Sequence, residues 1–219
     1  MDVIIFGATG MVGQGVLREC LLDTDVRRVL AIGRSVTGQR HEKLRELVHK
    51  DLSDFSGVER ELSGFDACFF CLGVSSAGMT EDRYHRVTYD ITMAAAQTLV
   101  KLSPNMTFIY VSGARADSTE SGRVMWARVK GKTENALLRL PFKAAYLFRP
   151  AGIQPMHGIT SRTRAYRIVY ALATPLLPLL RARFPKYVTT TEQLGLAMLN
   201  VAKNGYAKPV LESSDINSI

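Results

Sequence analysis

Residues 7–13 read Gly-Ala-Thr-Gly-Met-Val-Gly and join a short β-rich apolar run, residues 3–6, to a helical segment, residues 11–22. In such a stretch the first glycine permits a sharp turn, the second lets the backbone approach a pyrophosphate, and the third lets helix and sheet pack closely. The start of the helix supplies free N–H groups and the positive end of a dipole. The stretch therefore predicts a phosphate-binding turn made by Gly7, Thr9, Gly10, Met11, Val12 and Gly13.

Beyond this stretch, the remaining chain alternates apolar runs with helical segments. The pattern predicts strands at residues 3–6, 28–32, 47–49, 67–72, 107–112 and 144–148, and helices at residues 11–22, 42–47, 81–102 and 120–140. Apolar strands separated by helices indicate a parallel sheet covered on both faces. We expect an α/β fold, a Rossmann-like doubly wound parallel sheet of order 3-2-1-4-5-6, in one domain over residues 1–219.

The segment after Pro150 has a looser pattern. Residues 160–173 and 192–204 have helical character, and residues 208–211 fit an edge strand. Thr189 stands three residues before Glu192, which is the spacing of a capping box. Because this part is too small for a second domain, residues 151–219 are expected to form a small helical cap on the substrate side of the sheet.

The end of the second strand indicates which nucleotide binds. It reads Ala31-Ile32-Gly33-Arg34-Ser35, and no carboxylate occurs between Val26 and His41. A site for NAD(H) usually has Asp or Glu here to hold the ribose 2′-hydroxyl. Arg34 and Ser35 could instead hold a 2′-phosphate through charge-assisted hydrogen bonds. The pattern favours NADP(H) over NAD(H).

Two further strand ends contribute candidate cofactor residues. Asp51 and Leu52 follow the third strand, where they could border the adenine, although Asp51 could equally cap a turn. Cys71, Leu72 and Gly73 end the fourth strand beside the expected cofactor, and Gly73 would allow close approach of a ribose or simply form a turn. Cys68 and Cys71 lie three residues apart, so in a strand they point to opposite faces.

The formal charge is +8, from 28 Lys and Arg against 20 Asp and Glu, and it is concentrated in one segment. Between Asn135 and Thr191 there are nine basic residues and no acidic one. This segment favours an acidic small-molecule substrate, and its apolar residues 168–180 also fit weak contact with a membrane surface. No nucleic-acid motif accompanies it, so no nucleic acid is expected; a homodimer remains open.

The features that the sequence lacks bear on its compartment and on metal binding. It shows no secretory signal and no apolar run of about 18 residues that suggests a membrane span. Three cysteines, an odd number, favour a reducing compartment. These features predict a cytoplasmic protein, and no cluster of His, Asp and Glu has metal-ligand spacing, so no metal is expected.

These residues together resemble the short-chain dehydrogenase/reductase superfamily, in its atypical, NAD(P)-dependent epimerase/dehydratase-like branch, and are similar to the Tat-interacting-protein-like oxidoreductases. The resemblance is carried by GATGMVG, AIGRS, CLG at residues 71–73, YVSGARAD at 110–117, VKGKTE at 129–134 and FRPAGIQP at 148–155. It implies a catalytic Ser, Tyr and Lys, with Tyr and Lys four residues apart on one helix face. Ser112 and Lys130 match the Ser and Lys, Lys130 would also hold the nicotinamide ribose, and Pro150 would shape a loop against the carboxamide.

The expected tyrosine position holds Trp126, whose indole cannot act as an acid. Two hypotheses follow. In the first, the protein is an oxidoreductase or epimerase-like enzyme acting on a small carbonyl or hydroxyl compound, and another group or water supplies the proton; the candidates are Tyr84, Tyr89, Tyr110, His85 and His157. In the second, it binds NADPH without turnover and senses redox state or regulates a partner.

Overall fold

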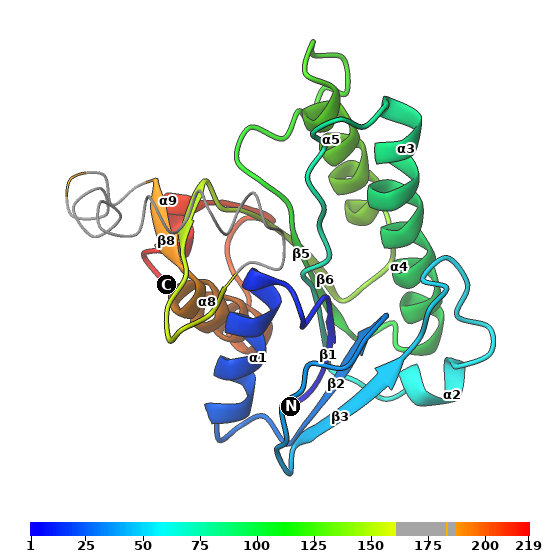
Figure 1. The fold of residues 1–219 in the computed structure, drawn as a ribbon, viewed down its shortest axis with the longest axis vertical. Coiled ribbons are helices and arrows are strands. Elements are labelled where there is room, and N and C mark those ends of the chain that lie inside the picture. Colours follow the sequence, from blue (N-terminus) through cyan, green and yellow to red (C-terminus); the bar gives the residue numbers. More distant parts are fainter. Residues whose placement is uncertain (161–182, 184–186) are drawn as a thin grey trace.

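A parallel β-sheet forms the centre of the computed structural model, which describes residues 1–160, 183 and 187–219. Its strand order is β3-β2-β1-β4-β5-β6-β9, so the predicted order of six strands is confirmed, and the edge strand expected at residues 208–211 is the seventh, beside β6 (Figure 1). The strands are β1 (Asp2–Phe6), β2 (Arg28–Gly33), β3 (Leu44–Val48), β4 (Ala67–Phe70), β5 (Thr107–Val111), β6 (Ala144–Arg149) and β9 (Val210–Glu212).

Helices cover both faces of this sheet. On one face lie α1 and α8, and on the other α3, α4 and α5 (Figure 1). Their bounds, with those of the shorter helices, are α1 (Met11–Leu22), α2 (Glu59–Leu62), α3 (Glu81–His85), α4 (Ile91–Leu102), α5 (Met125–Leu138), α8 (Thr191–Asn204) and α9 (Ser213–Ile216). This is the doubly wound Rossmann-like arrangement expected from the sequence.

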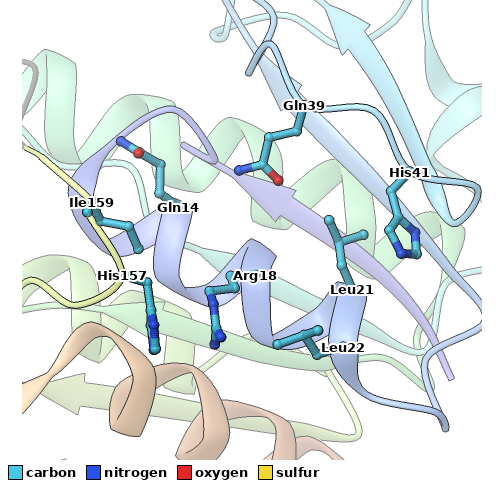
Figure 2. Close-up of a pocket in the computed structure, with 9 residues that line it drawn as sticks. Gln14, Arg18, Leu21, Leu22, Gln39, His41, His157 and Ile159 are labelled. Carbon is cyan, nitrogen blue, oxygen red and sulfur yellow. The ribbon is translucent and has the colours of Figure 1, made fainter.

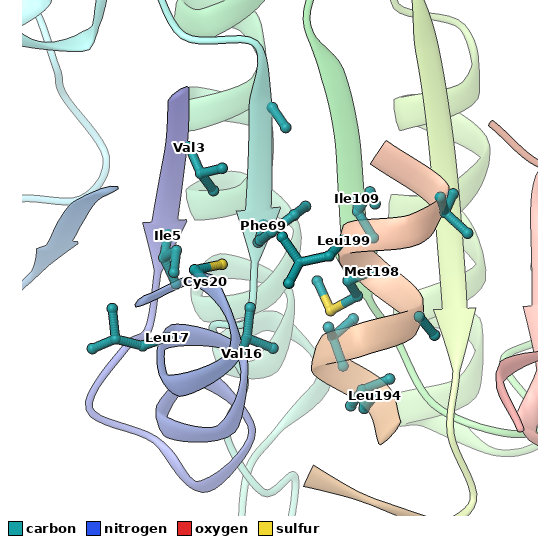
Figure 3. Packing of buried hydrophobic residues seen from close by; sticks show 14 of the residues in the cluster. Val3, Ile5, Val16, Leu17, Cys20, Phe69, Ile109, Leu194, Met198 and Leu199 are labelled. Atoms are coloured by element: carbon teal, nitrogen blue, oxygen red, sulfur yellow. The ribbon is translucent and has the colours of Figure 1, made fainter. Parts of the chain in front are cut away.

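Two apolar clusters, one on each face, fill the space between sheet and helices. Strand β1 feeds both, because alternate residues point to opposite faces: Val3 and Ile5 join the cluster under α1 and α8, whereas Ile4 and Phe6 join the other. Figure 3 shows the first cluster, in which Leu17 of α1 and Met198 of α8 pack toward the sheet. Burial on both faces explains why the strands are almost continuously apolar.

Three local expectations differ from the structure. Residues 42–47, expected to be helical, instead enter β3, which pairs along β2; a helix of six residues is marginal on its own, and the edge of β2 offers hydrogen bonds. The segment at 81–102 contains a π-helical stretch, Arg86–Asp90, between α3 and α4. Helix α5 begins at Met125 rather than near residue 120, because the carboxylate of Asp117 accepts hydrogen bonds from Thr119 and Gly122 and holds a loop there.

The C-terminal part is built into the fold more deeply than a cap would be. Helix α8 packs on α1 and the sheet, and β9 pairs in parallel with β6. A second, two-stranded sheet joins β7 (Gly152–Gln154) to β8 (Val188–Thr190). Thr190, one residue after the expected position, caps α8 by accepting a hydrogen bond from the Gln193 N–H. The helix expected at 160–173, the apolar run 168–180 and most of the basic segment lie outside the described residues.

Candidate functional site

The glycine-rich turn lies between β1 and α1, and its shape leaves no room for side chains at two positions. Gly7 has a φ of +80°, and a Cβ there would lie 2.9 Å from the backbone of Cys71. A Cβ on Gly13 would lie 2.0 Å from the Gly7 carbonyl oxygen. At Gly10 the nearest atom would be 3.4 Å away, which is ordinary contact. The fold therefore requires the outer two glycines, whereas at Gly10 it would tolerate a Cβ.

The first turn of α1 presents N–H groups that no side chain of the described residues caps. Gly10 stands at the N-cap with no side-chain hydrogen bond, and no acidic residue occupies the first turn. The Gly10 N–H donates to the Gly7 carbonyl at 2.9 Å, which fixes the turn. Thr9, Met11 and Val12 are half-buried around it. Uncapped N–H groups and the positive end of the helix dipole make this an anion-binding geometry.

A small hollow separates this turn from the ends of β2 and β3. It is lined by Ala8, Thr9, Ala31, Ile32, Gly33, Ser35, Thr37, Glu46, Leu47 and Val48. Glu46 pairs across the sheet with Ala31, and its carboxylate accepts a hydrogen bond from the Thr37 N–H at 2.5 Å. Sequence reasoning missed Glu46, because these residues were assigned to a helix. Correct β2–β3 register would have brought its carboxylate to this hollow.

Arg34 stands exposed at the rim of the same region. Within the described part of the chain, no hydrogen bond or ion pair engages its guanidinium. The carboxylate of Asp51 instead accepts hydrogen bonds from the backbone and hydroxyl of Ser53, which hold its pKa below the usual range. Leu52 is 6% exposed and packs in the second core cluster. Of these residues, Arg34 is the one left free to meet a ligand.

The end of β4 lies against the glycine-rich turn. The Cys71 N–H donates to the Phe6 carbonyl at 2.9 Å, and burial raises the pKa of its thiol. Cys68 belongs to one core cluster and Cys71 packs against the other, as their spacing predicted. Leu72 is half-buried, whereas Gly73 is exposed, and a Cβ added to Gly73 would meet no atom within 4 Å. Gly73 thus borders open space beside the turn.

The polar residues expected to carry chemistry meet at the end of β5. Ser112 is 9% exposed, and its hydroxyl oxygen is buried without a hydrogen-bond partner among the described residues. The Nζ of Lys130 lies 5.3 Å from the centre of the Tyr110 ring, and its side chain passes over Gly113. Burial lowers the pKa of Lys130 to about 8. Trp126 is half-buried one helical turn earlier on α5.

A buried ion pair fastens α5 to the end of β6. Glu134 is 1% exposed, and both its carboxylate oxygens accept hydrogen bonds from Arg149. Arg149 also donates to the Ser118 hydroxyl at 2.7 Å. Pro150 follows directly, is buried, and its carbonyl accepts from the Ala114 N–H at 3.1 Å. These contacts hold α5, and with it Lys130, against the loops that follow β5 and β6.

The other candidate proton donors are less well placed. Tyr84 and Tyr110 are 2% and 1% exposed, and burial raises the pKa of Tyr110. His85 pairs with Asp90 at 3.2 Å and stacks on Tyr89, whose ring also lies 5.0 Å from the Nζ of Lys132.

His157 lies in a separate groove of about 390 Å³ on the outer side of α1 (Figure 2). The groove is lined by Gln14, Arg18, Leu21, Leu22, Gln39, His41, His157, Gly158 and Ile159. His157 Nε2 is 2.5 Å from a carboxylate oxygen of Glu192 on α8. It therefore belongs to the α1–α8 side of the sheet, whereas Lys130 lies on the opposite side.

This geometry agrees with a comparison against protein families. The sequence profile of the NAD dependent epimerase/dehydratase family matches residues 3–119, just over half of the chain. The chain belongs to this family. The matched part of this epimerase-family chain runs from β1 through the loop after β5, so it contains the glycine-rich turn, Arg34, the end of β4 and Ser112. The resemblance to atypical short-chain dehydrogenase/reductases is confirmed.

Relatives in sequence are of two kinds. "Protein FMP52-2, mitochondrial" of Scheffersomyces stipitis is 28% identical over 149 residues, covering 67% of this chain and 63% of the relative. "Protein HTATIP2" of Rattus norvegicus is 29% identical over 152 residues, covering 68% of this chain and 61% of the relative. The match thus spans less than two thirds of the length of either relative.

Solved structures share the fold at low sequence identity. A UDP-N-acetylglucosamine 4-epimerase from Methanobrevibacter ruminantium M1 superposes with a TM-score of 0.71 at 14% identity, covering 96% of this chain and 75% of that chain. The Bordetella bronchiseptica enzyme WbmF, solved in complex with NAD+, gives a TM-score of 0.67 at 12% identity, covering 99% and 76%. At this identity the likeness shows the fold alone.

The relatives also correct the expected location. Several proteins named FMP52 from different yeasts carry the designation mitochondrial. This finding contradicts the cytoplasmic location expected from the sequence. That expectation rested on a missing export signal and a missing apolar span, and neither separates one reducing compartment from another. Over the residues that the structure describes, no helix has the length and apolarity needed to cross a bilayer.

Proposed function

We propose that this epimerase-family protein binds NADP(H) and acts as an oxidoreductase or epimerase-like enzyme on a small carbonyl or hydroxyl compound. One observation carries the proposal: the hydroxyl of Ser112, unpartnered among the described residues, and the ammonium of Lys130 meet at the same sheet edge as the uncapped turn. Carboxyl ends of parallel strands are where ligands bind in open α/β sheets. The nine basic residues between Asn135 and Thr191 favour an acidic substrate.

The residues present fit a dinucleotide. The turn offers N–H groups that no described side chain caps, and Gly73 borders space that the fold does not fill. When bound, the cofactor supplies or accepts a hydride. The residues that would hold it are Gly7, Thr9, Gly10, Met11, Val12 and Gly13 at the pyrophosphate, Arg34 at the adenosine end, Cys71, Leu72 and Gly73 at the ribose side, and Lys130 and Pro150 at the nicotinamide end.

The preference for NADP(H) rests on the adenosine end. Arg34 is exposed, and its guanidinium has no partner in the described part of the chain, so it is available for the bidentate recognition of a phosphate. Glu46 acts in the opposite sense, because its negative charge in the adjoining hollow would repel a 2′-phosphate. Its carboxylate already accepts a hydrogen bond from the Thr37 N–H, which moderates that repulsion.

At the reacting end, Ser112 and Trp126 would both serve as hydrogen-bond donors. Ser112 has a buried hydroxyl that lacks an acceptor among the described residues, so a substrate oxygen there would satisfy it. The Trp126 indole N–H can polarise a carbonyl but cannot exchange a proton near neutral pH. These donors orient the substrate and stabilise negative charge that develops on its oxygen.

Trp126 also supports a second candidate function, an NADPH-binding sensor or regulator without turnover. Replacing the phenol with an indole removes the group that usually transfers the proton, while the cofactor turn stays intact. Cofactor binding would then be preserved and catalysis lost.

Turnover of NADPH separates the two candidates. The purified full chain is mixed with NADPH and a panel of small aldehydes, ketones and keto acids, and NADPH absorbance and binding fluorescence are followed. The enzyme proposal predicts substrate-dependent oxidation by the wild type and a faster rate for Trp126→Tyr. NADPH binding without oxidation by either protein supports the sensor. Absence of NADPH binding by the folded protein contradicts both.

A further inference from the structure

The Lys130 side chain is half-buried, and an aromatic ring stands beside its charge. Its ammonium lies over the Tyr110 ring at 5.3 Å, and no carboxylate forms an ion pair with it in the described part of the chain. Glu134, four residues later on the same helix, could have paired with it, but Arg149 occupies both carboxylate oxygens. Lys130 is therefore a half-buried cation with hydrogen-bonding capacity left unused.

The direction of the strand brings this ammonium to Ser112. Residues two apart in a strand share a face, so Ser112 follows Tyr110 on the side of the sheet that α5 covers. The Lys130 side chain crosses over Gly113, where a Cβ would lie 3.9 Å from both its Cδ and Cε. A substrate oxygen that satisfies the Ser112 hydroxyl would therefore lie beside the end of the Lys130 side chain.

Based on the function proposed above, we propose that the Lys130 ammonium is itself the proton donor to the substrate oxygen, in the place where a tyrosine phenol would serve. When bound, the reduced cofactor would supply a hydride to the carbonyl carbon and be oxidised, and the electron pair of the C=O π bond would move to the oxygen. That oxygen accepts a hydrogen bond from Ser112 and one proton from Lys130 Nζ. The neutral amine that remains recovers a proton from water, and the carbonyl leaves as an alcohol.

The electrostatic surroundings suit this role. Burial lowers the pKa of Lys130 to about 8, and the charge of Glu134 opposes this only in part. An acid with a pKa near the working pH transfers protons most effectively. The ionisable groups on the elements around it are Glu134 and its partner Arg149, Arg128 and its partner Glu81, Lys132, Tyr110 of β5, Tyr84 of α3, and Tyr89, His85 and Asp90 of the π-helical stretch.

The deciding variant is Lys130→Arg, which keeps a positive charge for a ribose but holds its proton at all working pH values. Its matched control is Lys132→Arg, because Lys132 lies on the exposed side of the same helix and also places its Nζ over an aromatic ring. For each protein we would measure the NADPH dissociation constant by fluorescence and the pH profile of kcat with a carbonyl that the wild type reduces. We expect Lys130→Arg to keep NADPH affinity within about threefold and to lose at least about 100-fold in kcat. Lys132→Arg should match the wild type in both.

A titration gives a readout that does not depend on turnover. In wild-type protein labelled with ¹³C at lysine Cε and saturated with NADP+, one signal should titrate well below the others and be missing from Lys130→Arg. The proposal is overturned if that signal titrates with the bulk of the lysines, if Lys130→Arg keeps its kcat, or if the wild type binds NADPH but reduces no carbonyl. In each of these cases NADPH binding still stands, so the failure is distinct from failure of the cofactor assignment.

Discussion

The two ends of the candidate site differ in whether backbone or side chains form them. At the glycine-rich turn the backbone makes the site, and side chains at Gly7 and Gly13 are excluded by atoms of the same turn or of Cys71. At the end of β5, side chains make the site: Ser112, Lys130 and Trp126 stand on a strand end and a helix face that would accept other residues. The fold fixes the glycine-rich turn, whereas the side chains at the end of β5 can change while the fold stays the same.

This difference explains where the chain follows its family and where it departs. Substitution of Gly7 or Gly13 would disturb the packing of β1, β4 and α1 together, so these two positions are tied to the stability of the fold. Position 126, where the family resemblance implies a tyrosine, is a half-buried position on α5 that holds a tryptophan. Chemistry can therefore be altered or lost at the reacting end while nucleotide binding persists.

The largest effect is expected for Gly13→Ala. The added Cβ would lie 2.0 Å from the Gly7 carbonyl oxygen, so the turn or α1 must move. Overpacking usually costs about 1–3 kcal/mol, and we expect the free energy of unfolding, measured by urea denaturation, to fall by the upper end of this range or more. Gly10→Ala is the control: its Cβ lies 3.4 Å from the same oxygen, so stability should change little while NADPH binding weakens. Equal stability of the two variants would show that the turn is not fixed by the fold.

A smaller change in the free energy of unfolding is expected for Lys130→Met, and this change should stabilise the protein. Folding lowers the pKa of Lys130 from an ordinary value of 10.5 to about 8, so the charged form is disfavoured in the native state. Below pH 8 Lys130 carries its proton in both the native and the unfolded state, so the native state bears the full free-energy cost of the buried charge. Between about pH 8 and 10.5 the native state loses this proton while the unfolded state keeps it, and the cost disappears. Because the side chain is only half-buried, we expect the variant to be more stable by about 1–3 kcal/mol at pH 7.

The measurement is the free energy of unfolding of wild type and variant, without cofactor, at pH 7 and pH 10. The advantage of the variant should shrink at the higher pH. An advantage that stays constant, or grows, would contradict the assigned surroundings of Lys130.

The smallest effect concerns Glu46→Gln. The amide keeps an acceptor for the Thr37 N–H but removes a negative charge from the hollow beside Arg34. We expect NADPH to bind a few-fold more tightly relative to NADH, which is less than about 1.4 kcal/mol. The ratio of the two dissociation constants measures this, and a ratio that shifts toward NADH would show that Glu46 does not face the 2′-position.

The sequence allowed more of the fold than of the site to be predicted. The bounds of α1 and the order of the first six strands followed from hydrophobic period and the handedness of crossovers. The third strand, expected at residues 47–49, begins earlier, at Leu44, because its stability comes from pairing with β2, which a local pattern does not contain. The late start of α5 depends on a loop held by Asp117, whose hydrogen bonds reach five residues ahead.

Within the candidate site, the glycine residues of the turn could be proposed from the sequence. Gly7, Gly10 and Gly13 were recognised by spacing alone. Glu46 escaped notice because it reaches the hollow only through strand register, and the separation of His157 from Lys130 required knowing that α8 packs on α1. Properties that depend on long-range packing, such as the unshared charge of Lys130, were not accessible from sequence.

The most direct test of the account is a comparison of NADPH and NADH binding to the wild type and to Arg34→Ala. If the turn holds the pyrophosphate and Arg34, a cation that the described residues leave free, meets the adenosine end as proposed, wild type should bind NADPH at least about tenfold more tightly than NADH. Arg34→Ala should bind both with similar affinity, close to that of the wild type for NADH. A folded wild type that binds neither nucleotide, or a preference for NADPH that survives in Arg34→Ala, would contradict the account.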